Sequence, residues 1–146
     1  MEFELLNECH VRQIADLEKQ NFSAPWSEAS IAAEISNPLS LWVVAVDGDN
    51  VAGYVGSQTV LCEADMMNLA VAQEYRRQGI GRRLVSALID QLRANKTYCL
   101  TLEVRASNIA AISLYNGLGF EVVGRRPKYY SKPVEDALIL RKEWDV

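Results

Sequence analysis

Hydrophobic and polar residues follow two different periods along this chain, and the two periods predict an ordered series of helices and strands. Between residues 8 and 21, Val11, Ile14 and Leu17 recur at the spacing of one helix face. A wide apolar stripe likewise predicts a helix over residues 80–93. Two shorter helices are predicted over residues 27–35 and 108–118.

Capping residues and helix breakers set the expected boundaries of these helices. Asn7 and Ser27 carry side chains that can cap the first and the second helix. Pro25 disfavours helical backbone at the residue before it, which separates the two. Gly117 or Gly119 can end the last helix.

Seven β-rich runs predict strands before, between and after the helices. They cover residues 3–6, 41–46, 51–60, 64–71, 98–104, 120–126 and 136–144. The turn sequence DGDN at residues 47–50 predicts a hairpin between the second and third runs. Residues 128–133 are expected to form a loop between the last two.

This order of elements predicts a single α/β (α+β) domain over residues 1–146, built on one mixed sheet. The strand, glycine-containing loop, helix and strand at residues 65–104 are expected to form a right-handed parallel crossover. Such a crossover puts the loop at the carboxyl end of a strand, where open sheets bind ligands.

Composition and charge argue against several other classes of protein. The 146 residues are 49% hydrophobic and 23% charged, as is typical of a globular domain, and the formal charge is −4. A protein that coats nucleic acid is normally basic, so direct nucleic-acid binding is not expected. One histidine and three scattered cysteines give no metal site and no disulfide framework.

The sequence shows no sign of secretion or of membrane insertion. Its first ten residues lack a basic leader followed by an apolar core. No apolar run approaches the roughly 20 residues that a membrane span needs. We therefore expect a cytoplasmic protein without a membrane partner; the oligomeric state is open, and a monomer is the simplest expectation.

The stretch EYRRQGIGRR, residues 74–83, combines four arginines with two glycines. A helix that begins near Gly79 leaves its first N–H groups unpaired, and its dipole favours an anion there. The glycines remove Cβ atoms that would keep a phosphate away, and charged donors come from Arg76, Arg77 and Arg82. The loop therefore suits a diphosphate, although a glycine-softened helix start with a solvated arginine face fits the same residues.

Two common nucleotide motifs are absent from this loop, since neither the Lys-Ser/Thr of the Walker pattern nor G-x-G-x-x-G occurs. Its R-x-x-G-x-G at residues 76–81 resembles the R/Q-x-x-G-x-G/A signature of the GNAT acetyltransferases. LEVRASNIAAISLYNGLGF at residues 102–120 is similar to the second half of their core, and NFSAPWS at residues 21–27 resembles the bacterial ribosomal-protein alanine N-acetyltransferases. The resemblance spans about residues 22–130 and implies the GNAT fold, with helices on both faces of a mixed sheet.

The resemblance implies that acetyl-coenzyme A is the co-substrate and that no metal is required. The residues it assigns to the pyrophosphate are Arg76, Arg77, Gln78, Gly79, Ile80, Gly81 and Arg82. It assigns a hydrogen bond with coenzyme A to Asn108. Leu69, Ala70 and Val71 are implied to contact the pantetheine arm and the acetyl carbonyl, although buried strand is compatible with the same residues.

Acetyl transfer to an amine needs a base for the amine and benefits from an acid for the departing thiolate. Glu103 shares a strand face with Thr101 and could be an ordinary solvated residue; the resemblance implies that it is the general base, acting directly or through water. Tyr115 lies two helical turns from Asn108 and could be a core tyrosine; the resemblance implies that it is the general acid.

The acceptor side of the site is expected to include Trp26, Tyr129 and Tyr130, which could equally be a core anchor and edge-strand aromatics. The leading hypothesis is transfer of an acetyl group to the N-terminal alanine of a small-subunit ribosomal protein, whose basic charge would suit this acidic chain. The alternatives are a small-amine or protein-lysine N-acetyltransferase and, less favoured, a non-catalytic acyl-coenzyme A-binding module. A nucleotide-binding module is the least favoured.

Overall fold

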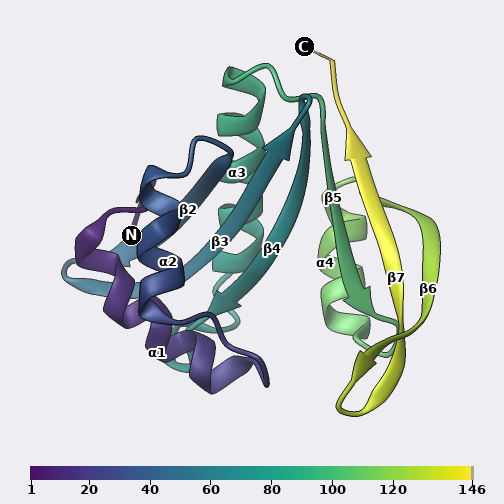
Figure 1. Ribbon diagram of the computed structural model, residues 1–146, viewed down its shortest axis with the longest axis horizontal. Helices are drawn as coiled ribbons and strands as arrows, with labels where there is room; N and C mark the ends of the chain where they lie inside the picture. Colours follow the sequence, from purple (N-terminus) through teal and green to yellow (C-terminus); the bar gives the residue numbers. More distant parts are fainter. Residues whose placement is uncertain (146) are drawn as a thin grey trace.

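The computed structural model describes residues 1–145, which form a seven-stranded sheet with helices on both faces (Figure 1). The strands are β1 (Glu2–Leu5), β2 (Ser40–Asp47), β3 (Asn50–Val60), β4 (Glu63–Val71), β5 (Cys99–Arg105), β6 (Glu121–Ser131) and β7 (Val134–Glu143). The helices are α1 (Val11–Asn21), α2 (Glu28–Ser36), α3 (Ile80–Ala94) and α4 (Ile109–Gly117), with short 3-10 turns at Glu8–His10 and Gln73–Tyr75. The expected fold class, a mixed sheet between two helical layers, is confirmed.

The sheet has the strand order β1-β2-β3-β4-β5-β7-β6. Within the described residues, β4 and β5 are its one parallel pair, and every other neighbouring pair is antiparallel. The parallel connection predicted for residues 65–104 is therefore present, with α3 as its crossover helix. The glycine-containing loop follows the carboxyl end of β4, as expected.

The capping residues mark helix boundaries as the sequence predicts. The Asn7 side chain accepts a hydrogen bond from the amide of Cys9 (2.9 Å), ahead of the 3-10 turn that leads into α1. Ser27 Oγ accepts from the amide of Ser30 (3.1 Å) at the start of α2. Gly119 has a left-handed backbone (φ 91°) just after α4, the position that favours glycine at a helix end.

The loop predicted over residues 128–133 is wrong, because β6 and β7 continue to a tight turn at Lys132–Pro133. Ser131 pairs with Val134 directly beside that turn. β6 lies at the edge of the sheet, where Pro127 can occupy a strand without removing a required ladder hydrogen bond.

Residues of β2 point alternately into two hydrophobic cores, one on each face of the sheet. Trp42 and Val44 belong to the cluster that packs under α1 and α2. Val43 and Ala45 belong to the larger cluster that packs under α3 and α4. This period of two explains why β2 reads as a continuous apolar run, since both of its faces are covered.

The parallel strands β4 and β5 are paired over a short length only. Glu63–Asp65 pair with Cys99–Thr101, and farther along the two strands diverge (Figure 1). β4 remains paired with β3 as far as Val71, with a register shift between Val55 and Ser57 that marks a bulge. Among the described residues, the distal part of β4 therefore has no strand partner on its β5 side.

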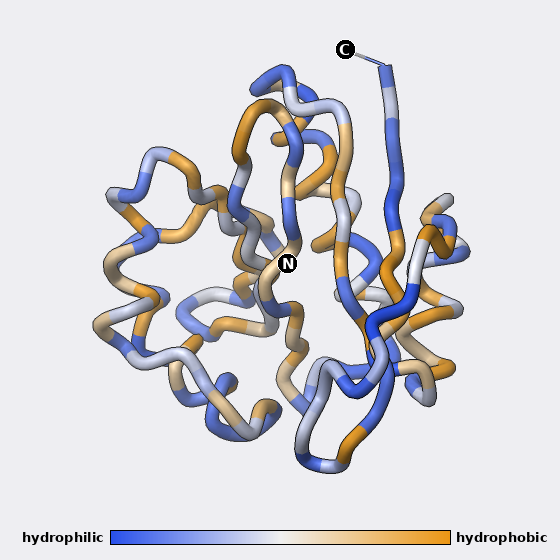
Figure 2. Tube along the Cα trace, turned by 45° about the vertical axis from the view of Figure 1, so that its right-hand side comes forward, coloured by the Kyte–Doolittle hydropathy of each residue, from blue (hydrophilic) through white to orange (hydrophobic). Residues whose placement is uncertain are grey.

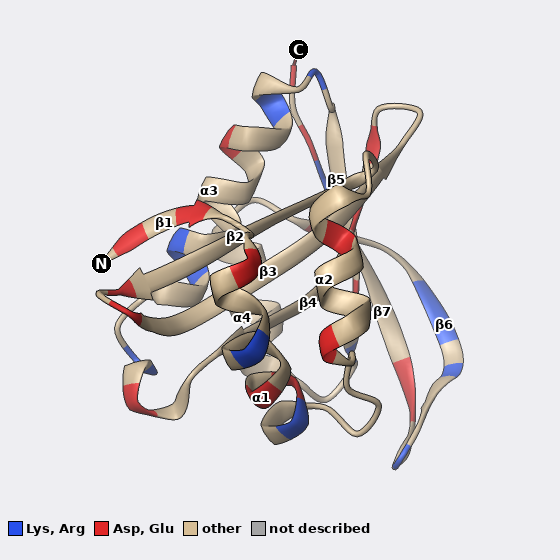
Figure 3. Cartoon of the chain, turned by 60° about the vertical axis from the view of Figure 1, so that its left-hand side comes forward, with Lys and Arg blue, Asp and Glu red and all other residues tan. Residues whose placement is uncertain are grey.

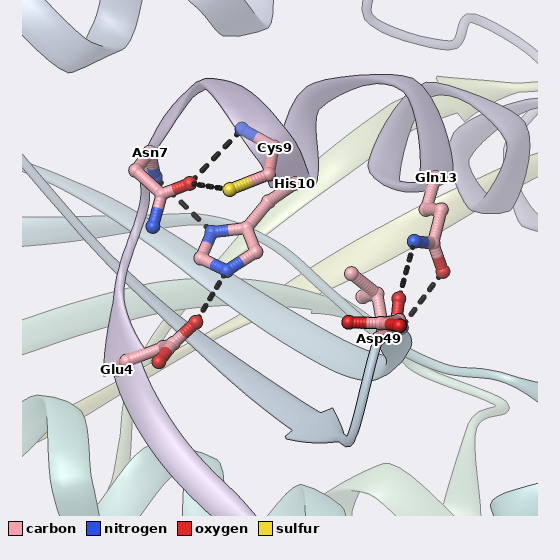
Figure 4. A network of polar contacts seen from close by, with 7 residues as sticks. Glu4, Asn7, Cys9, His10, Gln13 and Asp49 are labelled. Carbon is pink, nitrogen blue, oxygen red and sulfur yellow. Dashed lines mark hydrogen bonds and ion pairs between the residues drawn. The ribbon is translucent and has the colours of Figure 1, made fainter.

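Polar side chains tie the start of α1 to the sheet (Figure 4). His10 is buried, with Nε2 2.7 Å from Glu4 Oε1 on β1 and Nδ1 accepting from the amide of Asn7 (3.1 Å). Gln13 Nε2 donates to the backbone carbonyl of Asp49 in the β2–β3 hairpin (2.9 Å). The bond to Nδ1 places the proton of a neutral imidazole on Nε2, facing Glu4. These contacts fix the helix that leads into the α1–α2 connection.

Hydrophobic residues occur in short stretches along the whole chain (Figure 2). The longest helix of the described residues, α3, has 15 residues, fewer than the roughly 20 that a membrane span needs. In the part of the chain that the structure describes, no helix is long and apolar enough to cross a membrane.

Gly56→Ala is expected to destabilise the fold by about 3 kcal/mol, because an added Cβ would lie 2.5 Å from Trp42 Cε2 and overpacking of this kind is costly. The free energy of unfolding is measured by urea denaturation. Gly48→Ala is the control: its Cβ would meet nothing within 4 Å, so only the strain of φ 60°, about 1 kcal/mol, is expected. Equal losses in the two variants would contradict the packing explanation.

Candidate active site

A cavity of about 750 Å³ lies where β4 and β5 diverge. Its walls come from the α1–α2 connection, β4, β5, α4 and the β6–β7 hairpin. The lining includes seven residues singled out in the sequence: Trp26, Leu69, Glu103, Asn108, Tyr115, Tyr129 and Tyr130. Ala70, Val71 and the loop at residues 76–82 are outside this lining. The candidate acid, base and acceptor residues are thus brought into one cavity, and the glycine-containing loop lies beyond it.

Glu103 projects from β5, where its backbone pairs with Ile139 of β7. Its side chain is 29% exposed, and Oε1 lies 3.6 Å from Nε of Arg126 on β6. An ion pair between partly exposed groups is weak, so it orients the carboxylate without withdrawing it from the cavity. Glu103 is therefore available to accept a proton from a group bound there.

Tyr115 is 5% exposed and projects from α4 into the cavity wall. Its hydroxyl lies 3.5 Å from Met66 Sδ, and its ring packs edge to face against Phe120 at 5.4 Å. Burial, with a smaller contribution from Tyr130, raises the pKa of Tyr115 above that of a free tyrosine. A thioether is a weak acceptor, so the phenol keeps its proton and can donate it elsewhere.

Asn108 is the N-cap of α4 and lies about two helical turns before Tyr115 in the same helix. Its Oδ1 accepts a hydrogen bond from the amide of Ala111 (3.1 Å), which fixes the side chain. Within residues 1–145, the amino group of this amide has no hydrogen-bond partner. A capping residue in this state can still donate to a ligand in the cavity.

The glycine-containing loop presents an anion-binding helix start. Gly79 is the N-cap of α3 with φ 74°, and the first intrahelical bond runs from the amide of Arg83 to its carbonyl (3.1 Å). The amides of Ile80, Gly81 and Arg82 have no hydrogen-bond partner among the described residues. A Cβ at Gly79 would meet no atom within 4 Å, so the space before these amides is open. The loop fits a pyrophosphate group.

Two arginines of the loop also contact the protein itself. Arg76 donates through Nε to the carbonyl of Val71 (3.1 Å) and through a terminal nitrogen to Asn21 Oδ1 at the end of α1 (2.8 Å). Arg82 donates to the carbonyl of Gly117 at the end of α4 (3.2 Å). Besides the charge predicted for them, these side chains therefore connect the loop to both α1 and α4.

Leu69, Ala70 and Val71 occupy the last part of β4. They pair with β3 through one edge, while the other edge faces the space from which β5 has diverged. Ala70 is buried in the core under α1 and α2, and Leu69 also lines the cavity. The side chains of this segment pack and its outer edge remains open, so the ligand contact stays a prediction that is compatible with the structure.

The acceptor side of the cavity is aromatic and carries paired charges. Trp26 packs edge to face on Trp42 at 5.4 Å, and Tyr129 does the same with Tyr130 at 5.1 Å. The guanidinium of Arg105 lies 4.3 Å from the centre of the Tyr130 ring. Basic residues are visible along β6 (Figure 3), and the charged residues of the lining itself are Glu103, Arg105 and Lys132. The aromatics are both structural anchors and cavity walls.

Sequence reasoning missed several residues of this site, above all Glu18 and Asn68. Glu18 on α1 is fully buried, and Asn68 on β4 lines the cavity. A signal for Glu18 existed, because it lies four residues after Ile14 and seven after Val11, within the apolar stripe of its helix. A carboxylate in such a stripe is buried and needs hydrogen-bond partners inside the protein. Asn68 gave no comparable signal.

Among residues 1–145 there is no group of three or more His, Cys, Asp or Glu side chains that could hold a metal ion. The arrangement offers other means of chemistry: a base, a protonated phenol, open strand-edge amides and a helix start for an anion. These are the requirements of acyl transfer from a thioester carried by a diphosphate-containing cofactor.

The sequence matches the Acetyltransferase (GNAT) family over residues 11–120. This chain belongs to the GNAT acetyltransferases, which use acetyl-coenzyme A as the acetyl donor. The resemblance noted in the sequence is therefore confirmed.

Its relatives include named N-acetyltransferases. The chain is 40% identical over 126 residues to the [ribosomal protein bS18]-alanine N-acetyltransferase of Escherichia coli, covering 85% of this chain and 84% of the relative. It is 37% identical over 144 residues to the uncharacterized protein ML0378 of Mycobacterium leprae, covering 94% of this chain but 39% of that longer protein. The crystal structure of the ribosomal-protein-S18-alanine N-acetyltransferase from Escherichia coli superposes with a TM-score of 0.89 at 35% identity, covering 99% of this chain and 94% of that one.

Gly79→Ala is expected to weaken coenzyme A binding about tenfold. Gly79 has a left-handed backbone, which costs a residue with a Cβ roughly 1–2 kcal/mol, so the helix start would shift to relieve the strain. Gly81→Ala is the matched control, because its Cβ would lie at ordinary contact distances of 3.8 Å from Val71 and 3.9 Å from Leu114. Its affinity is expected to stay within about twofold of the wild type. Isothermal titration with coenzyme A measures both. An equal loss in the two variants would argue against the left-handed backbone of Gly79 as the cause of the weaker binding.

Proposed function

We propose that this chain transfers the acetyl group of acetyl-coenzyme A to the α-amine of an N-terminal alanine on a small-subunit ribosomal protein. The observation that carries the proposal is the 40% identity to the Escherichia coli bS18-alanine N-acetyltransferase, which extends over 84% of that enzyme. The cavity supports it, since Glu103 and Tyr115 line the same space as the aromatic acceptor wall. A ribosomal substrate would be met in the cytoplasm.

In this proposal Glu103 prepares the acceptor amine for attack. The carboxylate takes one proton from the α-ammonium group, directly or through a water molecule, and the neutral nitrogen then attacks the thioester carbonyl. A peptide α-amine has a pKa of about 7.7–8.0, so a modest base is sufficient. The outer edge of β4 at Leu69–Val71 offers amide donors for the carbonyl oxygen as negative charge develops.

Tyr115 completes the transfer as the carbon–sulfur bond breaks. Its hydroxyl proton passes to the departing sulfur, so that the thiol leaves neutral and the phenolate regains a proton from solvent. Glu103 passes its first proton to solvent, and its carboxylate then takes the remaining extra proton from the new amide nitrogen. The helix start at Gly79–Arg82 holds the diphosphate, and Asn108 donates to the coenzyme. No metal and no covalent enzyme intermediate are used.

The proposal predicts turnover on one of three peptides. The first begins with alanine followed by a basic ribosomal sequence, the second carries a pre-acetylated alanine and an internal lysine, and the third begins with another residue. Release of coenzyme A thiol is expected with the first alone. Turnover on the second would favour a lysine acetyltransferase, and acetyl-coenzyme A binding without turnover on any peptide would favour a small-amine acceptor or a binding module.

Glu103→Gln and Tyr115→Phe are expected to lower kcat on the alanine peptide by about 10²–10³-fold, because each removes a group that moves a proton in the reaction. Coenzyme A affinity, measured by titration, is expected to stay within about threefold, since neither residue belongs to the helix start that takes the diphosphate. Unchanged kcat in both variants would overturn the assigned acid and base.

The pH dependence of kcat/KM should rise to a plateau and show no fall caused by Tyr115 up to about pH 10. Burial raises the pKa of Tyr115, so its phenol remains protonated at pH values where a free tyrosine, with a pKa of about 10, begins to ionise. The rising limb reflects deprotonation on the base and amine side. A falling limb below pH 9 that disappears in Tyr115→Phe would contradict this assignment.

A further inference from the structure

A buried carboxylate lies behind the acceptor side of the cavity. Glu18 on α1 is 0% exposed and accepts hydrogen bonds from three residues that are distant in sequence. The backbone amide of Trp26 donates to Oε1 (2.9 Å), and Asn68 Nδ2 lies 3.0 Å from each carboxylate oxygen. The hydroxyl of Tyr54 donates to Oε2. Every donor around this group points at the carboxylate.

The three partners of Glu18 come from three different elements. Trp26 belongs to the α1–α2 connection and Asn68 to the bulged part of β4, and both line the cavity. Tyr54 is on β3 behind the wall, with its ring stacked on Trp42 at 6.0 Å. Trp42 in turn packs edge to face against Trp26. The carboxylate therefore holds both lining residues, Trp26 and Asn68, and the aromatic stack holds Trp26 as well.

Glu18 has no opening to the cavity through which it could act as a base. Both of its oxygens are engaged by two donors each, and the side chain is completely covered. Within residues 1–145 it forms no ion pair. Burying an unpaired carboxylate is costly, and the cost is offset only when its lone pairs are satisfied as they are here.

A glutamine at this position could not reproduce the arrangement. Its amide offers one accepting oxygen, and its NH₂ group would face donors from Asn68 or Trp26. Tyr54 keeps its proton, because burial and the bond to Glu18 raise its pKa, so it remains a donor as well. Replacing the carboxylate therefore removes at least one of the contacts that hold Trp26 and Asn68 in their present positions.

We infer that Glu18 is a positioning residue for the acceptor: it fixes Trp26 and Asn68 relative to each other and so sets the shape of the pocket that receives the amine. The inference rests on the proposed function in one respect, that the acceptor enters between the α1–α2 connection and β4.

The chain offers a matched control in Glu34 on α2, which is also buried, at 7% exposed. Its carboxylate accepts from Trp42 Nε1 (3.3 Å), Gln58 Nε2 (2.8 Å) and Asn37 Nδ2 (3.1 Å). None of these three donors lines the cavity. Glu34→Gln thus removes the same kind of buried hydrogen-bond acceptor with no direct contact to a lining residue, since its one link to the acceptor wall is through Trp42, which packs on Trp26. The variant reports the general effect of such a change on stability.

The test compares Glu18→Gln, Glu34→Gln and the wild type by steady-state kinetics with the alanine peptide and with acetyl-coenzyme A. In Glu18→Gln, kcat/KM for the peptide is expected to fall about tenfold or more, mainly through KM, while KM for acetyl-coenzyme A stays within about twofold. In Glu34→Gln, both parameters are expected to stay near wild-type values, although the melting temperature falls. Equal effects in the two variants, or parallel changes in both KM values of Glu18→Gln, would overturn the inference.

Tyr54→Phe provides a second measurement if Glu18→Gln does not fold. It removes one donor, keeps the ring, and is expected to raise KM for the peptide about threefold without changing KM for acetyl-coenzyme A. An unchanged peptide KM in folded Tyr54→Phe and Glu18→Gln would count against the network. Failure of the proposed function has a different signature, since the wild type itself would not acetylate the alanine peptide. In that case the same comparison is made with the amine that the wild type does acetylate.

Discussion

The site depends on a parallel strand pair that is joined over three residues and then opens. An unpaired strand edge in the middle of a sheet leaves backbone groups that must meet water or a ligand. Both strands maintain the opening. The bulge in β4 bends that strand away from β5. β5 remains paired with β7 over its whole length, from Cys99 to Arg105. The cavity is thus a consequence of how the sheet is paired, and the side chains of α4 and the β6–β7 hairpin complete its walls.

The two helical layers contribute different parts of the site. The layer of α3 and α4 supplies the helix start for an anion and the buried phenol, and its larger core holds both helices against the sheet. The layer of α1 and α2 supplies, through the connection that contains Trp26, the cavity wall that we propose for the acceptor. Arg76 links the two sides, because it leaves the loop after β4 and reaches Asn21 at the end of α1. A hydrogen bond therefore joins the loop proposed for the acetyl donor to the helix that precedes the wall proposed for the acceptor.

Local signals in the sequence were sufficient for most of the fold, and long-range ones were needed for the rest. Helix caps such as Asn7 and Ser27 and the DGDN hairpin depend on neighbouring residues, and they are where the sequence indicated. The continuation of β6 past Pro127 could not be predicted locally, because proline is tolerated within a strand mainly at the edge of a sheet, and edge position is a property of the whole sheet. The candidate lining residues were found through motif resemblance, whereas Glu18 and Asn68 meet across fifty positions of sequence and could not be paired from it.

The open helix start at Gly79 has a consequence for inhibition. The diphosphate that we propose for this helix start is identical in acetyl-coenzyme A and in the coenzyme A released after transfer, so the interaction energy gained there would be the same before and after the reaction. Such energy captures the donor from dilute solution but contributes nothing to lowering the chemical barrier. It equally retains the spent coenzyme, which must therefore compete with fresh donor. The enzyme's rate should accordingly follow the ratio of acetylated to free coenzyme in its surroundings as well as the supply of acceptor.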